Sequence, residues 1–246
     1  MRKRPKMLMF SSDDGILHLM IIINFKDYVE STGENAVSLA KEFEKVFLET
    51  NVPIVVVVHP FDLQNVVNAC PNLDVFCQTA DSYTLGEDGA KKQTQTGRIT
   101  PIVLKRAGAK GIILNHAENP VSSDDEIARI VEDMKTDFPE AMIVVCAESS
   151  ERAETVSKQV EVDYIAIEPP DLIGGDISVT TRPEIIEEAV SKVGDNVLVG
   201  AGVKTAEDVT KALALGAKGV LLASGVIKSK DGKAPYEVLM ALAKAF

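Results

Sequence analysis

Basic residues are scarce in this chain relative to acidic ones. The 26 lysines and arginines stand against 37 aspartates and glutamates, which gives a formal net charge of -11. Binding to nucleic acid or to an anionic membrane surface requires a basic face that displaces counterions, and the only basic cluster lies within the first six residues. The composition therefore argues against nucleic acid and against membranes as partners.

Cysteine is equally scarce. Cys70, Cys77 and Cys146 form no CxxC pair and no even set. A disulfide framework needs paired cysteines, and a structural metal site needs closely spaced soft ligands. We therefore expect three reduced thiols in a cytoplasmic protein, with neither a disulfide nor a metal site.

Long apolar runs are absent as well. Residues 1–19 open with a basic cluster, but their apolar run, Met7–Phe10, spans only four residues before the polar SSDD. This run is much shorter than a membrane span or the hydrophobic region of a signal peptide. We interpret residues 1–19 as an extension that the fold does not use, either disordered or the product of an upstream start codon.

The chain does contain a repeated pattern of short apolar runs. They do not alternate apolar with polar residues, so both faces of each strand must be covered, as is typical of parallel sheets in α/β proteins. The eight runs are Met20–Asn24, Pro53–Val58, Asp74–Gln78, Gly111–Asn115, Met142–Cys146, Asp163–Ile167, Asn196–Gly200 and Gly219–Ala223.

Helical patterns separate the apolar runs. Asn35–Glu49 repeats apolar residues at intervals of three and four, and Ser123–Lys135 carries a serine and acids in its first turn, where they suit unpaired N–H groups. Thr205 is the expected N-cap of a later helix and Gly216 its expected stop.

Eight such units leave two parallel architectures, a closed (β/α)8 barrel or an open doubly wound sheet. An open sheet usually has a GxGxxG loop after its first strand, whereas the first run here continues into NFKDY. We therefore predict an α/β fold with a (β/α)8 barrel in a single domain, residues 20–246, because no linker or shift in composition divides that range.

Chemically active residues gather where the predicted strands end, which is where barrels of this kind carry their chemistry. Asn24 and Lys26 end the first run and lie two residues apart, on the same side of an extended chain. His116 follows the fourth run. Glu168 ends the sixth, just before two prolines.

The last two runs end in small residues ahead of short helices, VGAGV (Val199–Val203) and LLASG (Leu221–Gly225). Several backbone N–H groups can converge on one anion in such loops. A protein of net charge -11 can therefore still bind a phosphate group.

Five segments together, INFKDY, LNHAE, AIEPPDLIGGD, GAGVKTAEDV and VLLASGVIKSKD, resemble the archaeal triosephosphate isomerases in order and spacing, from Met20 to about Asp231. The resemblance implies an isomerase of glycolysis and gluconeogenesis that interconverts dihydroxyacetone phosphate and D-glyceraldehyde 3-phosphate through an enediolate. It also implies a homodimer or homotetramer, with no metal and no organic cofactor.

The resemblance also assigns catalytic roles. Glu168 corresponds to the general base that moves a proton between C1 and C2, and His116 to the neutral electrophile that polarises the carbonyl. Lys26 corresponds to the positive charge near the enediolate oxygen and the phosphate, and Asn24 to a residue that orients the site.

Phosphate binding is assigned in the same way to backbone around four residues: Ile173, Gly202, Ala223 and Ser224. The segment Pro169–Ile177 corresponds to a lid that shields the enediolate from water.

Two departures from the family pattern stand out. The lid reads Gly174, Gly175 and Asp176 where the family more often has IGTG. The segment after the third run, DSYTLGEDGAKKQTQTGRI, is longer than expected for the archaeal group, and in related enzymes it helps to build the subunit interface.

Other polar residues have simpler interpretations. We expect Glu118 to pair with Lys26 or to be a plain exposed acid, and His59 to be structural. We expect Cys146 to pack among the barrel layers.

Two alternative functions share part of this pattern. Another sugar-phosphate isomerase barrel would keep the GAG and ASG segments but would have no use for this Lys, His and Glu set. A barrel that binds a phosphorylated metabolite without turning it over would keep the site, with its altered lid.

Overall fold

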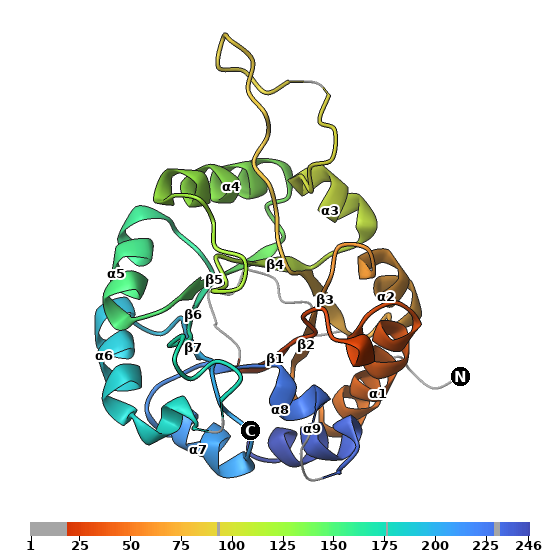
Figure 1. Ribbon diagram of the computed structural model, residues 1–246, viewed down its shortest axis with the longest axis vertical. Coiled ribbons are helices and arrows are strands. Elements are labelled where there is room, and N and C mark those ends of the chain that lie inside the picture. Colours follow the sequence, from red (N-terminus) through yellow and green to blue (C-terminus); the bar gives the residue numbers. More distant parts are fainter. Residues whose placement is uncertain (1–18, 93, 176, 229–231) are drawn as a thin grey trace.

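The computed structural model describes residues 19–92, 94–175, 177–228 and 232–246 (Figure 1). The predicted extension, residues 1–19, lies outside the described residues except for Leu19, and so does Asp176 of the predicted lid.

Eight parallel strands close into a barrel in chain order, with β1 hydrogen-bonded to both β2 and β8 (Figure 1). This confirms the predicted fold class. The strands are β1 (Met20–Asn24), β2 (Ile54–Val58), β3 (Asp74–Cys77), β4 (Gly111–Leu114), β5 (Met142–Ala147), β6 (Tyr164–Ile167), β7 (Val197–Val199) and β8 (Gly219–Leu222).

Helices surround the barrel and follow the strands in turn (Figure 1). The α-helices are α1 (Glu34–Thr50), α2 (Leu63–Ala69), α3 (Pro101–Ala107), α4 (Asp124–Asp137), α5 (Ser150–Gln159), α6 (Pro183–Val193), α7 (Ala206–Ala214), α8 (Ser224–Ile227) and α9 (Pro235–Ala243). Two short 3-10 turns are η2 (Val29–Ser31) and η3 (Val179–Thr181). No helix in the described part of the chain is long and apolar enough to cross a bilayer.

The strands form because their alternate residues fill two separate apolar layers. One set packs inside the barrel: Met20, Ile22, Val55, Val57, Phe76, Ile113, Val144, Cys146, Tyr164, Ala166, Leu198 and Leu221. The intervening residues pack outward against the helices. Cys146 thus packs in the barrel interior, as predicted.

Helix ends follow the local chemistry of the sequence. The Ser123 hydroxyl accepts a hydrogen bond from the Glu126 N–H at the start of α4. Thr205 caps α7 in the same way, through Asp208, and Gly216 follows that helix at φ +98°, where glycine is favoured. All three predicted end signals are therefore confirmed.

The segment between β3 and α3 projects from the rim of the barrel (Figure 1). Leu85 and Lys91 form an antiparallel bridge within it. The Lys91 ammonium lies 3.1 Å from a carboxylate oxygen of Asp133 and 3.1 Å from one of Asp137, so that α4 anchors the projection.

Candidate active site

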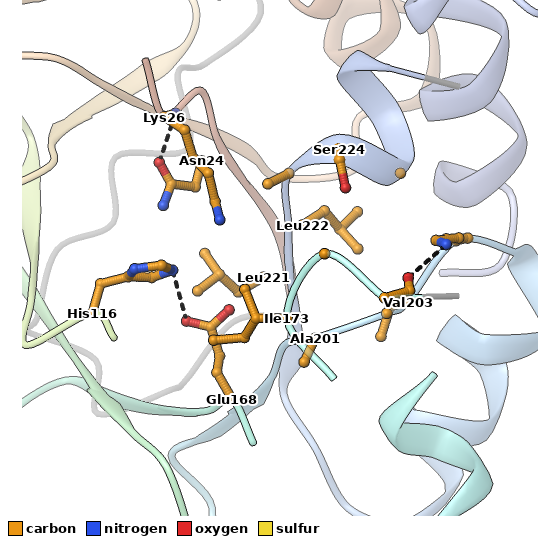
Figure 2. Close-up of a pocket in the computed structure, with 16 residues that line it drawn as sticks. Asn24, Lys26, His116, Glu168, Ile173, Ala201, Val203, Leu221, Leu222 and Ser224 are labelled. Carbon is orange, nitrogen blue, oxygen red and sulfur yellow. Dashed lines mark hydrogen bonds and ion pairs between the residues drawn. The ribbon is translucent and has the colours of Figure 1, made fainter. Parts of the chain in front are cut away.

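The eight residues singled out from the sequence line one pocket at the carboxyl ends of the strands (Figure 2). They are Asn24, Lys26, His116, Glu168, Ile173, Gly202, Ala223 and Ser224. They come from the ends of β1, β4, β6, β7 and β8 and from the segment after β6. Barrel closure therefore brings together residues far apart in the sequence.

Glu168 directly follows β6 and is 7% exposed. Its N–H donates to the Ala147 carbonyl at 2.9 Å, which continues the sheet by one residue. Its Oε2 atom is buried and has no hydrogen-bond partner among the described residues, and it lies 3.6 Å from Nε2 of His116 (Figure 2). This oxygen is therefore available to a bound molecule.

The pKa of Glu168 is raised to about 7. Burial is the largest cause, because it disfavours the charged form, and the negative charge of Glu118 adds to it. A hydrogen bond from the Cys146 thiol and the positive charge of Lys26 act in the opposite direction. The result is a carboxyl group that can both take and give a proton near neutral pH.

Gly200, just after β7, makes room for this carboxyl group. A Cβ atom at Gly200 would lie 2.5 Å from Cγ of Glu168 and 2.6 Å from its Oε1. These distances are far below van der Waals contact, so the absence of a side chain at Gly200 sets the position of Glu168.

His116 is 6% exposed and lies two residues beyond β4. Its Nδ1 accepts a hydrogen bond from the Glu118 N–H at 3.1 Å, so in the neutral ring the proton sits on Nε2, the atom that faces Glu168. Burial and the positive charge of Lys26 lower the pKa of His116, against an opposing effect of Glu118. The imidazole is therefore a neutral donor.

Lys26 lies beyond the end of β1 with φ at +50°. The Asn24 and Lys26 side chains both line the pocket, as expected, but the chain does not stay extended, because the backbone turns at Lys26. Instead, the Lys26 N–H donates to Oδ1 of Asn24 at 3.0 Å. The Lys26 ammonium lies 2.6 Å from Oε1 of Glu118, which confirms the pairing considered for that acid.

Gln78 holds this turn in place, and the sequence reasoning missed it. Its Nε2 donates to the Lys26 carbonyl at 2.9 Å and to Oδ1 of Asn24 at 3.3 Å. A signal was present, because alternation from Phe76 makes Gln78 the next inward-facing residue at the end of β3.

Ile173, Gly202 and Ser224 lie at the other side of the pocket, where two loops and the segment after β6 approach one another. Gly202 has φ +73°, and a Cβ atom there would lie only 2.0 Å from the carbonyl oxygen of Ile177. Only glycine allows so close an approach.

His59 does not line the pocket. Its Nδ1 accepts a hydrogen bond from the Phe61 N–H at 3.3 Å, and the two rings are 5.1 Å apart. These contacts agree with the structural role expected for it. Within the described ranges, no three His, Cys, Asp or Glu side chains form a group that could hold a metal ion.

Comparison with known proteins gives a consistent result. The model of the family described as triosephosphate isomerase matches residues 19–245. The triosephosphate isomerase of Methanothermus fervidus is 39% identical over 227 residues, which cover 90% of this chain and 97% of the relative. That of Methanobacterium bryantii is 39% identical over 220 residues (87% and 92%), and that of Pyrobaculum calidifontis is 38% identical over 231 residues (92% and 95%).

These relatives are archaeal, which agrees with the resemblance seen in the sequence motifs. The match spans all eight strands and includes every residue named above as lining the pocket. The chain therefore belongs to the triosephosphate isomerase family.

Proposed function

We propose that this protein interconverts dihydroxyacetone phosphate and D-glyceraldehyde 3-phosphate through an enediolate. One observation carries the proposal beyond family membership. A buried carboxylate oxygen of Glu168, without a hydrogen-bond partner in the described structure, lies 3.6 Å from the Nε2 atom of a histidine kept neutral by burial. A base beside a neutral hydrogen-bond donor is what proton transfer next to a carbonyl group requires.

Glu168 acts as the general base. It removes a proton from the carbon next to the carbonyl group and returns it to the neighbouring carbon. Its pKa of about 7 suits both steps, because a base titrating near the working pH can take up a proton and release it again.

His116 and Lys26 stabilise the charge that develops on the substrate oxygens. The Nε2–H of neutral His116 donates to the carbonyl oxygen and then to the enediolate oxygen. Lys26, held by Glu118 at 2.6 Å, supplies a positive charge on the same side of the pocket. Asn24 orients Lys26, because its Oδ1 atom accepts a hydrogen bond from the Lys26 backbone N–H.

Backbone groups around Ile173, Gly202, Ala223 and Ser224 bind the phosphate group. All four residues line the pocket, and Ser224 lies on the side away from His116 (Figure 2). Pro169–Ile177 covers the enediolate and keeps water out, since an exposed enediolate phosphate loses its phosphate group.

The same proposal extends to the cellular setting. The catalytic unit is residues 20–246, it acts in the cytoplasm in glycolysis and gluconeogenesis, and it needs neither a metal nor an organic cofactor. The three cysteines are free and buried, in agreement with reduced thiols. Of the alternatives, neither a non-catalytic barrel nor another sugar-phosphate isomerase is favoured, because the family match and the similar proteins all point to triosephosphate isomerase.

We propose a homodimer or homotetramer, and exposed apolar side chains support it. Phe61 is 89% exposed and follows β2, and Val29 is 79% exposed and begins η2 after β1. Burying large apolar side chains of this kind is the main driving force of subunit association. Sedimentation velocity of the active enzyme measures the state directly, and an active monomer would refute it.

Isomerase activity on D-glyceraldehyde 3-phosphate tests the main proposal. The wild-type protein, freed of metal with a chelator, should be active, and Glu168→Gln should lose nearly all activity. Glu168→Asp, which withdraws the carboxylate by about 1 Å, should lose roughly a hundredfold. Normal turnover in Glu168→Asp would show that another group is the base.

A further inference from the structure

Lys204 lies in the loop between β7 and α7 and has no role in the mechanism above. Among the described residues that line the pocket, Lys26 and Lys204 are the two cationic side chains. Lys26 is on the side of His116, whereas Lys204 is next to Gly202 and Val203, on the side assigned to the phosphate group. Its placement therefore raises the question of what a second cation does there.

The side chain of Lys204 reaches across to the segment after β6. Its ammonium donates to the carbonyl oxygen of Gly175 at 2.7 Å. Gly175 is two residues from Ile173, and Ile173, Gly174 and Gly175 all line the pocket. Lys204 thus holds one end of the segment to which phosphate binding is assigned.

The backbone of Lys204 is itself fixed. Its N–H donates to Oδ2 of Asp208 at 3.1 Å, and Oδ1 of the same carboxylate accepts a hydrogen bond from the Thr180 hydroxyl at 2.7 Å. Burial pushes the pKa of Asp208 up, but the hydrogen bonds from Thr180, Lys204 and Thr205 outweigh it and lower the pKa. An ionised Asp208 therefore fixes the loop that carries Lys204.

The aliphatic stem of Lys204 lies close to the start of α8, which follows β8. A Cβ atom at Gly225 would lie 3.0 Å from Cγ of Lys204, so the lysine stem runs close to the first turn of α8, which includes Ser224. Lys204, itself in the loop after β7, therefore lies against both the turn after β8 and the segment after β6.

We propose that Lys204 is a positioning residue that fixes the Ile173–Gly175 segment against the phosphate side of the pocket, and that catalysis depends on the substrate phosphate through this contact. The inference rests on the proposed isomerase function. A phosphate dianion bound beside an ammonium group and the amides that it holds in place is stabilised by both. A substrate without a phosphate group gains nothing from Lys204.

The experiment compares Lys204→Met and Lys204→Arg with Lys211→Met, an exposed lysine on α7 that does not line the pocket. In Lys204→Met, kcat/KM for D-glyceraldehyde 3-phosphate should fall roughly tenfold, the size expected for one charged hydrogen bond. The affinity for 2-phosphoglycolate should fall with it. The slow deprotonation of D-glyceraldehyde, which has no phosphate group, should stay unchanged.

A second measurement reports on how well the segment covers the enediolate. If the segment loosens, more of the enediolate phosphate eliminates: its electron pair forms a C=C bond as the C–O bond to phosphate breaks, which gives inorganic phosphate and the enol of 2-oxopropanal. The phosphate released per isomerisation should therefore rise in Lys204→Met. Lys204→Arg should recover part of the loss because it keeps the charge, and Lys211→Met should match the wild type in every assay.

Three outcomes would overturn the inference or its premise. Wild-type behaviour of Lys204→Met in all assays would mean that the contact with Gly175 has no function. Equal losses with the phosphorylated and the phosphate-free substrate would indicate general damage to the site. An inactive wild-type protein would refute the proposed function instead, and the phosphoglycolate affinities of the variants would still decide the role of Lys204.

Discussion

Two carboxyl groups lie at opposite ends of the barrel and share one physical property. Glu168 stands at the carboxyl end of β6, with a pKa raised to about 7, and Asp74 begins β3 at the amino end, with a pKa raised to about 6. Burial is the largest cause in both cases. At the amino end Lys110 opposes the shift, as Lys26 does at the carboxyl end.

The surroundings make the same shift useful at one end and costly at the other. Glu168 faces a pocket, beside a neutral histidine and with one oxygen atom unpartnered among the described residues. Asp74 does not line that pocket. A raised pKa therefore marks a functional group only where geometry also places reactive partners around it, and otherwise it is a loss of stability.

Of the substitutions that test this comparison, Gly200→Ala should change enzyme activity the most. The new Cβ atom would lie 2.5 Å from Cγ of Glu168, so the carboxylate must move, and a displacement of about 1 Å costs roughly a hundredfold in rate. We expect kcat to fall by that factor in steady-state assays, with a smaller change in the affinity for 2-phosphoglycolate. Unchanged kcat would mean that Glu168 tolerates displacement. Its position would then not explain why Glu168 is functional and Asp74 is not.

Asp74→Asn should act on stability and leave catalysis alone. The pKa of Asp74 is higher in the folded state, about 6, than its ordinary value of 3.8. Its contribution to stability is therefore complete below about pH 4 and is lost as the pH rises through about 6. An asparagine does not ionise, so at pH 8 the variant should be more stable than the wild type, by at most about 3 kcal/mol.

Urea unfolding at pH 8 and at pH 4.5, together with kcat at pH 8, checks this expectation. Glu168→Gln is the matched variant, because it removes the same kind of ionisation at the other end: it should also gain stability at pH 8, but lose activity. If Asp74→Asn is less stable than the wild type at both pH values, the Asp74 carboxyl group stabilises the folded state. The proposed contrast with Glu168 would then be wrong.

Cys146→Ala should have the smallest effect. The Cys146 thiol lowers the pKa of Glu168 by a hydrogen bond, so its removal should raise that pKa and move the acid limb of the kcat/KM profile to higher pH. Cys77→Ala is the control, since Cys77 packs in the outer apolar layer between strands and helices. A profile that moves equally in both variants would point to loosened packing instead.

The sequence predicted the fold well because its signals are local. Doubly buried apolar runs appear as unbroken stretches such as Ile54–Val58, and helix ends appear as caps such as Thr205. The main site residues could be predicted for a related reason. In a barrel, strand ends meet at one face, so Lys26, His116 and Glu168 could be grouped before any contact was known.

The residues that sequence reasoning missed act through contacts between distant segments. Gln78 matters because it reaches the turn at Lys26, and Gly200 matters because Glu168 occupies the space beside it. Lys204 matters because of a carbonyl group 29 positions earlier in the chain. Alternation from Phe76 indicates only that Gln78 faces inward. The contacts themselves depend on how neighbouring segments lie in three dimensions.

Closure of the barrel between β1 and β8 has a consequence for synthesis of the protein. Met20 pairs with Gly219, so the strand made first completes its hydrogen bonds only when the strand made last is present. A nascent chain that stops before β8 keeps two open strand edges and lacks Ala223 and Ser224, half of the residues assigned to the phosphate group. Enzyme activity should therefore be absent from intermediates on the ribosome that end before β8.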